Sequence, residues 1–176
     1  MVAWVPSVLP GGSAALASTC ETKRRDQIMA DVIEQLIAAM NRHDAKAVAA
    51  CFAADYRSEQ PLHPNRGFGG SEQVLTNWTS VFEGVPDFNA ERIASCSAEG
   101  IAWTEMRWTG THRDGTPFLM RGVTVIGVRD DQIAWARLYM EPVEEGGTDI
   151  EAAVQELYRP PQDADGTTGP EENLGS

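Results

Sequence analysis

Three stretches in the second half of the chain alternate between apolar and polar residues with the period of β-strands. They cover residues 101–111, 117–128 and 132–143 and are rich in Val, Ile, Thr, Trp and Tyr, which favour extended structure. Turn-forming residues separate them, at 112–115 and 129–131, in a pattern typical of tight hairpins. The chain is therefore predicted to form three consecutive antiparallel strands here.

Helical periodicity dominates the first half. Asp44 stands where its carboxylate can cap a short helix at 45–53, and a third helix is expected from Ser71 to Gly84, where Gly and Pro end it. Before these, apolar residues at three- and four-residue spacing predict an amphipathic helix that ends near residue 42: Ile28, Val32, Ile33, Leu36, Ile37 and Met40.

Shorter elements fill the remaining positions. Residues 56–60 read as a short strand and residues 88–95 as a further strand before the three long ones. A last helix is expected at 149–158, because Thr148 and Glu151 have the spacing of a capping box. Three helices followed by a run of antiparallel strands indicate an α+β fold with the sheet curled around the helices.

The two ends differ in composition from the part between them. Residues 160–176 are rich in Pro, Gly and acids and are expected to be a disordered tail. Residues 1–27 are expected to be a disordered extension. They carry no positive charge before Lys23, and Pro and Gly interrupt their apolar run, which does not fit a secretory signal. One domain at 28–159 is the resulting prediction.

Charge and cysteine content exclude several classes of function. The formal net charge of -12 in 176 residues opposes binding to nucleic acid or to anionic membranes, both of which attract basic surfaces. The three cysteines, Cys20, Cys51 and Cys96, show no metal-binding spacing. We therefore expect a cytoplasmic protein with reduced thiols, without a metal or another cofactor.

The order of elements and three segments of sequence resemble a known superfamily. The segments are AAMNRHDAKAVAACFAADY at 38–56, GGSEQVLTNW at 69–78 and RDDQIAWARLYMEP at 129–142. They are similar to nuclear transport factor 2, ketosteroid isomerase and the SnoaL-like polyketide cyclases, and the resemblance covers residues 29–143. It implies a conical half-barrel, in which a curved, mainly antiparallel sheet wraps around three N-terminal helices. It also implies a pocket for an apolar small molecule, and commonly a homodimer packed sheet to sheet.

At the positions where these relatives have catalytic residues, this chain has apolar residues. Aligned with members similar to limonene epoxide hydrolase, Met106 and Trp108 stand at the positions of the catalytic Arg and Asp. Leu138 stands where cyclases and hydrolases keep an Asp in the last strand. The fold alone does not decide function, since it carries several unrelated activities.

Alternation along the strands gives two possible linings for the pocket. In the interpretation that we favour, the pocket side carries Thr104, Met106, Trp108, Ala136, Leu138 and Met140. The opposite face is then an outer surface or a dimer interface, carrying Trp103, Glu105, Arg107, Trp135, Arg137, Tyr139 and Glu141. In the mirror-image interpretation, the acids and Tyr139 would line the pocket and could perform acid/base chemistry.

Two functional hypotheses follow. The first is a small-molecule-binding protein that either acts as a cofactor-free isomerase, cyclase or hydratase or descends from one, with Glu59, His63 and Glu105 as candidate acid/base residues. The second is a non-catalytic, dimeric module for ligand binding or protein interaction. In both, the candidate ligand-binding residues are the same: Ser58, Gln60, Trp78, Met106, Trp108 and Leu138.

Overall fold

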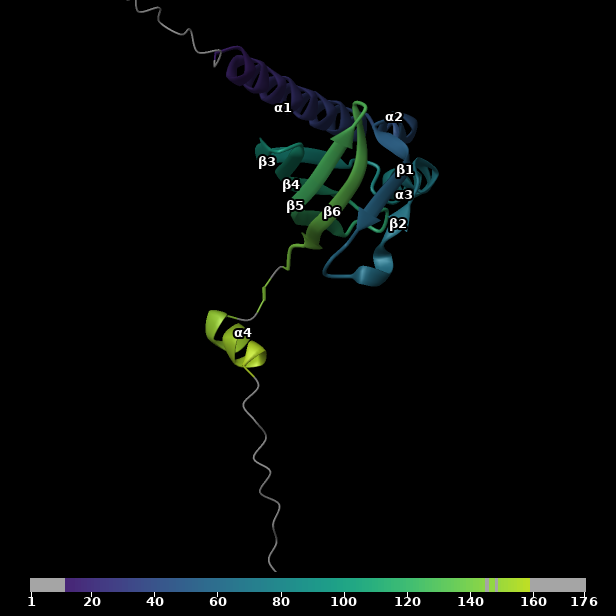
Figure 1. The fold of residues 1–176 in the computed structure, drawn as a ribbon. Helices are drawn as coiled ribbons and strands as arrows, with labels where there is room; N and C mark the ends of the chain where they lie inside the picture. Colours follow the sequence, from purple (N-terminus) through teal and green to yellow (C-terminus); the bar gives the residue numbers. More distant parts are fainter. Residues whose placement is uncertain (1–11, 145, 148, 159–176) are drawn as a thin grey trace, which may run out of the picture. The chain divides into compact units, whose positions relative to one another are not determined.

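The computed structural model describes residues 12–144, 146–147 and 149–158, with side chains described from Glu21 onward. The chain divides into two units, Met1–Val143 and Glu144–Ser176. Among the described residues, the first contains the sheet, three α-helices and a short 3-10 turn, and the second contains one α-helix (Figure 1).

A six-stranded mixed sheet forms the centre of the first unit. Its spatial order is β2-β1-β6-β5-β4-β3. The pairing of β1 with β6 is parallel and the other pairings are antiparallel. The three long strands predicted from alternation are β4, β5 and β6. The strand bounds are β1 Phe52–Glu59, β2 Phe68–Gly69, β3 Asn89–Ala98, β4 Ile101–Thr111, β5 Pro117–Arg129 and β6 Gln132–Pro142.

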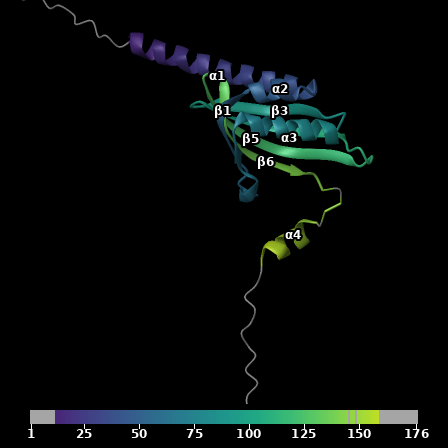
Figure 2. The same ribbon diagram turned by 90° about the vertical axis from the view of Figure 1, so that its right-hand side faces the viewer.

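Three helices pack on one side of this sheet. Helix α3 lies inside the curl of the sheet, while α1 runs along β3 (Figure 2). Asp44 caps α2 as predicted, because its Oδ1 accepts a hydrogen bond from the Ala47 backbone N–H at 2.9 Å. A short 3-10 turn, η1, lies between β1 and β2. The bounds are α1 Gly12–Asn41, α2 Ala45–Ala50, η1 Pro64–Arg66 and α3 Ser71–Gly84.

Helix α1 is longer than its apolar stripe predicted. It begins at Gly12 rather than near Ile28, so residues 12–27 are helical where the sequence favoured a disordered extension. Segment 13–27 contains three Ala, two Arg and one each of Leu, Lys, Glu and Gln, and these nine of its fifteen residues have high intrinsic helix propensity even without a face to bury. Residues 1–11 of the predicted extension lie outside the described residues.

Two hairpins of the sheet close through residues with positive φ. Glu99 and Gly100 join β3 to β4 with φ of 54° and 78°, and Asp130 and Asp131 join β5 to β6 with φ of 51° and 58°. Positive φ at both central residues is the mark of the type I′ turn, whose twist matches that of paired strands. The reversal predicted at 129–131 is thus a two-residue hairpin turn.

The hydrophobic core lies between the helices and the inner face of the sheet. On β4, Thr104 and Met106 are 1% and 3% exposed, while their neighbour Trp103 is 38% exposed. This confirms the favoured strand orientation and contradicts its mirror image. Other buried apolar residues come from every layer: Met29, Val32, Ile33, Ala39, Met40, Val48, Tyr56, Val74, Phe88, Ala102, Ile126, Ile133 and Ala136.

The second unit contains helix α4, Ile150–Leu157. Its N-cap is Asp149, whose carboxylate accepts a hydrogen bond from the Ala152 N–H at 2.9 Å. Thr148, the residue predicted to cap this helix, lies outside the described residues, as does the predicted tail at 160–176. The division after Val143 assigns α4 to a different unit from the one that the sequence predicted for it.

Candidate functional site

Strand β1 turns a row of polar side chains toward the helices. Tyr56 and Ser58 are 3% and 4% exposed, while Arg57 and Glu59 between and after them are exposed. Side chains two residues apart share one face of a strand, and Gln60, just beyond the end of β1, follows the same spacing. The Tyr56 ring packs edge to face against Phe52 and Phe68, with centroids 4.7 Å and 5.9 Å away. The phenol is thus held by two aromatic neighbours.

Two tryptophans from different layers meet on another side of the same space. Trp78 of α3 and Trp108 of β4 pack edge to face, with ring centroids 5.6 Å apart. Phe88 contacts both, at 5.4 Å and 5.9 Å. Such aromatic pairs add about 0.5–1.5 kcal/mol beyond the burial of their area. Trp78, Phe88 and Trp108 therefore form a closely packed aromatic cluster, and the two tryptophans form part of the cavity wall.

A cavity of about 230 Å³ lies between the sheet and the helices. Apolar side chains dominate its lining, and the polar exceptions are Tyr56, Ser58, Gln60, Asn77 and Thr124. Of the described residues that line it, only Tyr56 has an ionisable side chain. The apolar lining residues are Leu36, Met40, Phe52, Phe68, Val74, Trp78, Val81, Met106, Trp108, Ile126, Ile133, Ala136 and Leu138.

The environment of Tyr56 alters its acidity. Burial raises the pKa of its phenol from an ordinary 10.0 to about 12, and the nearby Ser58 hydroxyl opposes this rise in part. Ser58 Oγ nevertheless has no partner at full hydrogen-bonding geometry among the described residues, so its contact with the phenol is a loose one. At neutral pH the phenol is therefore un-ionised and can donate a hydrogen bond.

All six residues proposed to bind a ligand line this cavity. Ser58 and Gln60 come from β1 and its end, Trp78 from α3, and the remaining three from β4 and β6: Met106, Trp108 and Leu138. The positions that carry charge in catalytic relatives therefore present apolar groups to the cavity.

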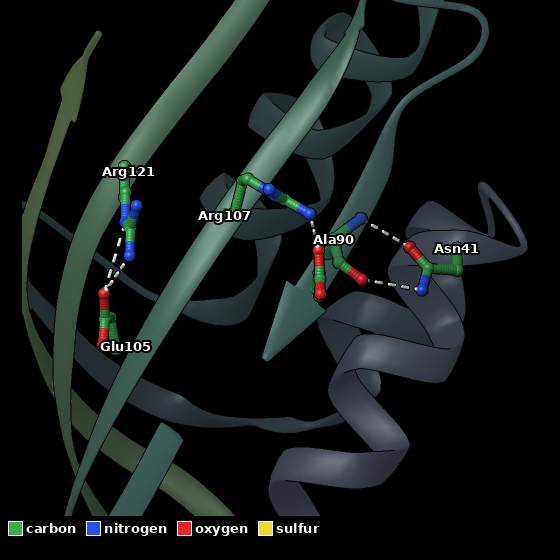
Figure 3. A network of polar contacts seen from close by, with 6 residues as sticks. Asn41, Ala90, Glu105, Arg107 and Arg121 are labelled. Atoms are coloured by element: carbon green, nitrogen blue, oxygen red, sulfur yellow. Dashed lines mark hydrogen bonds and ion pairs between the residues drawn. The ribbon is translucent and has the colours of Figure 1, made fainter. Parts of the chain in front are cut away.

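The three proposed catalytic residues lie elsewhere. Glu59 Oε2 accepts a hydrogen bond from Arg137 at 2.8 Å, His63 Nε2 lies 2.9 Å from Glu141 Oε1, and Arg121 donates to Glu105 Oε1 at 2.8 Å. None of the three lines the cavity. Figure 3 shows Arg121 reaching along the sheet to Glu105. Glu59 and Glu105 point away from the cavity because side chains alternate between the two faces of a strand. Their neighbours Ser58 and Met106 point into it.

These ion pairs are part of a charged outer face, which we define by outward side chains of β1, β4, β5 and β6. Arg107 also pairs with Glu91, and Arg129 with Asp55. The outer face comprises Asp55, Glu59, Trp103, Glu105, Arg107, Arg121, Arg129, Trp135, Arg137, Tyr139 and Glu141. Because Asp55, Glu59 and Glu105 pair with arginines and are partly solvated, this face has the character of a surface rather than of a proton-transfer site.

Among the polar lining residues, sequence reasoning missed three, Tyr56, Asn77 and Thr124. Tyr56 could have been found, because residues 56–60 were expected to be extended and Ser58 and Gln60 were already candidates. The two-residue period then places Tyr56 beside them. Asn77 and Thr124 had no comparable signal, since they come from a helix and a strand that meet only in the fold.

Three further features of the described residues bear on function. No group of three or more His, Cys, Asp or Glu side chains among them is arranged to hold a metal ion. Cys51 is half-buried, its thiol donates to the Ala47 carbonyl at 3.4 Å, and burial raises its pKa. No helix within the described ranges is both long and apolar enough to cross a membrane.

Solved structures with the same fold belong to proteins that are described with different activities. A candidate isomerase from Bacillus subtilis is 17% identical, with a TM-score of 0.60 over 66% of this chain and 88% of that one. IdmH, a candidate polyketide cyclase from Streptomyces antibioticus, is 22% identical, with a TM-score of 0.56 over 64% and 91%. A hypothetical protein from Catenulispora acidiphila with a ketosteroid isomerase-like fold, solved in complex with trimethylamine, is 18% identical, with a TM-score of 0.54 over 60% and 82%.

At such identities these likenesses establish the fold alone. Among proteins with curated functions, none matches the sequence. The family model described as the SnoaL-like domain matches residues 33–136, a range that runs from α1 to β6 and includes most of the residues around the cavity. The chain belongs to the SnoaL-like domain family.

Proposed function

We propose that this protein binds an uncharged, largely apolar small molecule in the cavity between α3 and the sheet. The observation that carries this proposal is the cavity itself, about 230 Å³ enclosed by Trp78, Trp108 and other apolar side chains. Ligand sites are typically concave and apolar, with a few polar groups that fix orientation. This volume is below the roughly 300–1,000 Å³ of sites for drug-sized ligands, which favours a compact ligand.

The lining favours binding over acid/base turnover. A general base must reach the proton that it removes, and the described lining residues include no carboxylate or imidazole. Tyr56, with its raised pKa, is suited to donating a hydrogen bond rather than to accepting a proton. Isomerase, cyclase or hydratase chemistry is therefore the second candidate, and it would have to rely on the substrate's own reactivity and on orientation within the cavity.

A bicyclic hydrocarbon, tetralin, tests the binding proposal. Its association with the full-length protein can be followed by saturation-transfer NMR and by quenching of tryptophan emission, since Trp78 and Trp108 form part of the wall. Ala136→Leu places extra carbon atoms in the cavity, because Ala136 lines it and is 4% exposed. We expect this variant to weaken tetralin binding by about tenfold or more, as loss of apolar contacts worth ~1.4 kcal/mol would do.

Ala94→Leu is the matched control, because Ala94 lies on an exposed part of β3. It should leave tetralin binding unchanged. Absence of saturable binding to the unmodified protein, or equal affinities of the Ala136→Leu and Ala94→Leu variants, would contradict the proposal.

We propose in addition that the outer face mediates a homodimer. Trp103 and Tyr139 on this face are 38% and 37% exposed, and aromatic residues and Arg are enriched where proteins associate. The Arg137 guanidinium lies over the Trp135 ring, 5.2 Å from its centroid. Light scattering coupled to gel filtration should give a dimer for the full-length protein, and Trp103→Glu should shift it to monomer. A monomeric unmodified protein would exclude this assembly.

A further inference from the structure

The walls of the cavity become more exposed toward the ends of β1 and β6. On β1, Tyr56 and Ser58 are buried, whereas Gln60, the next lining residue, is half-buried. On the part of β6 that lines the cavity, Ala136 is buried and Leu138 is half-buried. Because β1 and β6 run parallel, exposure increases in the same direction on both strands. We call this end of the cavity, near the C-terminal ends of β1 and β6, the mouth.

Residues 61–67 border the mouth. They connect two residues that line the cavity, Gln60 at the end of β1 and Phe68 at the start of β2. They also form part of a smaller hollow that shares Ser58 and Gln60 with the cavity. The residues that line this hollow are Ser58, Glu59, Gln60, Pro61, Pro64 and Gly67. A ligand that enters at the mouth therefore passes next to this segment.

Segment 61–67 has few attachments to the rest of the fold. It is followed by β2, which is only two residues long and pairs with β1 at Phe68 and Gly69. Backbone hydrogen bonds such as that from the Arg66 N–H to the His63 carbonyl, at 2.9 Å, hold the segment to itself. Six of its seven residues are exposed, and His63 is the exception. Segments with so few buried contacts open locally at low cost in free energy.

The half-buried residue of this segment makes a contact with the far side of the mouth. His63 Nε2 lies 2.9 Å from Glu141 Oε1, and Glu141 lies near the end of β6. The two side chains are 36% and 39% exposed, and pairs that are exposed to this degree are weak. A weak contact between a loosely attached segment and a strand of the sheet is suited to reversible opening.

We infer that segment 61–67 is a lid over the mouth, and that the His63–Glu141 pair is the latch that holds it closed. This inference rests on the proposed binding function and adds the route by which a ligand enters and leaves. Neither latch residue lines the cavity, so the latch is the same with and without ligand. Its loss increases the open fraction equally in the free and in the bound protein. The rate constants of association and dissociation then rise together, and the affinity, which is their ratio, is unchanged.

Stopped-flow measurement of tryptophan quenching by tetralin tests the lid on the full-length protein. The observed rate at a series of tetralin concentrations gives the two rate constants. We expect His63→Ala and Glu141→Ala each to raise both rate constants by about threefold, with the equilibrium affinity changed by less than about twofold. The double variant should be no faster than either single variant, because the second substitution removes a partner that has already lost its contact.

Glu105→Ala is the matched control. It removes the partner of Arg121 from a partly exposed ion pair on the outer face, away from the lid, and should leave both rate constants unchanged. Four results would overturn the lid while leaving the binding function intact: unchanged rates in both single variants, a change in only one of them, effects that multiply in the double variant, or faster dissociation without faster association. Failure of tetralin to bind the unmodified protein would overturn the lid and the binding function together.

Discussion

The side-chain amide of Asn41 makes two hydrogen bonds with the backbone of Ala90. Asn41 Nδ2 donates to the Ala90 carbonyl at 2.9 Å, and Asn41 Oδ1 accepts from the Ala90 N–H at 2.7 Å (Figure 3). Asn41 ends α1, and Ala90 lies in β3, an edge strand of the sheet. The amide therefore satisfies both backbone groups of Ala90, which on an edge strand have no neighbouring strand to pair with. It also fixes the end of α1 against the sheet.

Asn41→Ala should lower the free energy of unfolding by about 1–3 kcal/mol, because it leaves two largely buried backbone groups without partners. Chemical denaturation in urea measures this change. Gln27→Ala is the control, since Gln27 makes an exposed side-chain hydrogen bond to Asp31 on the same helix. It should change stability by less than ~0.5 kcal/mol. Equal stabilities of the two variants would mean that the Asn41 pairing does not hold helix and sheet together.

The Asn41 pairing also illustrates the limit of reasoning from sequence. The long strands and the family were accessible, because alternation, turn residues and helical spacing are local signals. An Asn at the end of a helix gives no sign that it will meet a backbone 49 residues later. The helical state of residues 12–27 was missed for another reason, since their propensity is local but no apolar stripe marks them.

For the candidate site, the sequence predicted correctly which strand residues line the cavity, but the residues proposed for acid/base catalysis lie outside it. Met106, Trp108 and Leu138 were placed in the cavity by strand alternation, and they line it. Glu59, His63 and Glu105 were selected because they can carry acid/base chemistry, which says nothing about the direction in which they point. Their cationic or anionic partners, such as Arg121 for Glu105, lie on neighbouring strands and became visible only with the register of the sheet.

The phenol of Tyr56 should make stability depend on pH in the alkaline range. Its pKa is raised from 10.0 to about 12 in the folded chain, so the unfolded chain loses this proton first. The contribution is fully present below pH 10 and is lost as pH rises toward 12. Over this range the free energy of unfolding should fall by about 2–3 kcal/mol on account of this group. Urea unfolding at a series of pH values measures the fall.

In Tyr56→Phe, the part of the fall in unfolding free energy at alkaline pH that is due to this phenol should be absent. In Tyr139→Phe it should remain. Absorbance of tyrosinate gives an independent readout, because the chain has only three tyrosines. The difference between the titration curves of the unmodified protein and of Tyr56→Phe should have its midpoint near pH 12. A midpoint near pH 10 would show that the phenol is not buried as described.

Neutral substitutions of the three acid/base candidates, Glu59, His63 and Glu105, should leave ligand binding intact. Glu59→Gln and Glu105→Gln each alter an exposed or half-exposed ion pair, and His63→Gln alters the hydrogen bond to Glu141, all outside the cavity. Such pairs contribute about 0–1 kcal/mol to stability. Affinity for tetralin should change by less than about twofold, and stability by no more than ~1 kcal/mol. Calorimetric binding and urea unfolding measure the two quantities.

Leu138→Gln provides the contrast, because it places an amide of similar size on the cavity wall from β6. It should weaken tetralin binding clearly where the outer-face variants do not, since a buried polar group then faces an apolar ligand. A strong loss of binding in Glu59→Gln or Glu105→Gln, with stability retained, would instead restore these acids as site residues.

Gly122 allows β5 and β6 to approach closely, and its replacement should be poorly tolerated. A Cβ atom at this position would lie 1.9 Å from the Tyr139 carbonyl oxygen and 3.0 Å from Met140 Cα. Both are backbone atoms of the paired strand, so relief of the clash requires separation of the strands. We expect Gly122→Ala to cost at least ~2 kcal/mol of unfolding free energy. It should also weaken tetralin binding, because Leu138 of β6 lines the cavity.

Gly84→Ala is the matched control for this substitution. A Cβ atom on Gly84 would meet no atom within 4 Å, and Gly84 is the last residue of α3, so the change should be neutral or stabilising by up to ~1 kcal/mol. Urea unfolding of both variants measures the difference between their free energies of unfolding. If Gly122→Ala were as stable as Gly84→Ala, β5 and β6 could not be paired with Gly122 opposite Met140. The inward positions on β6 would then have to be assigned again, and with them the wall of the cavity.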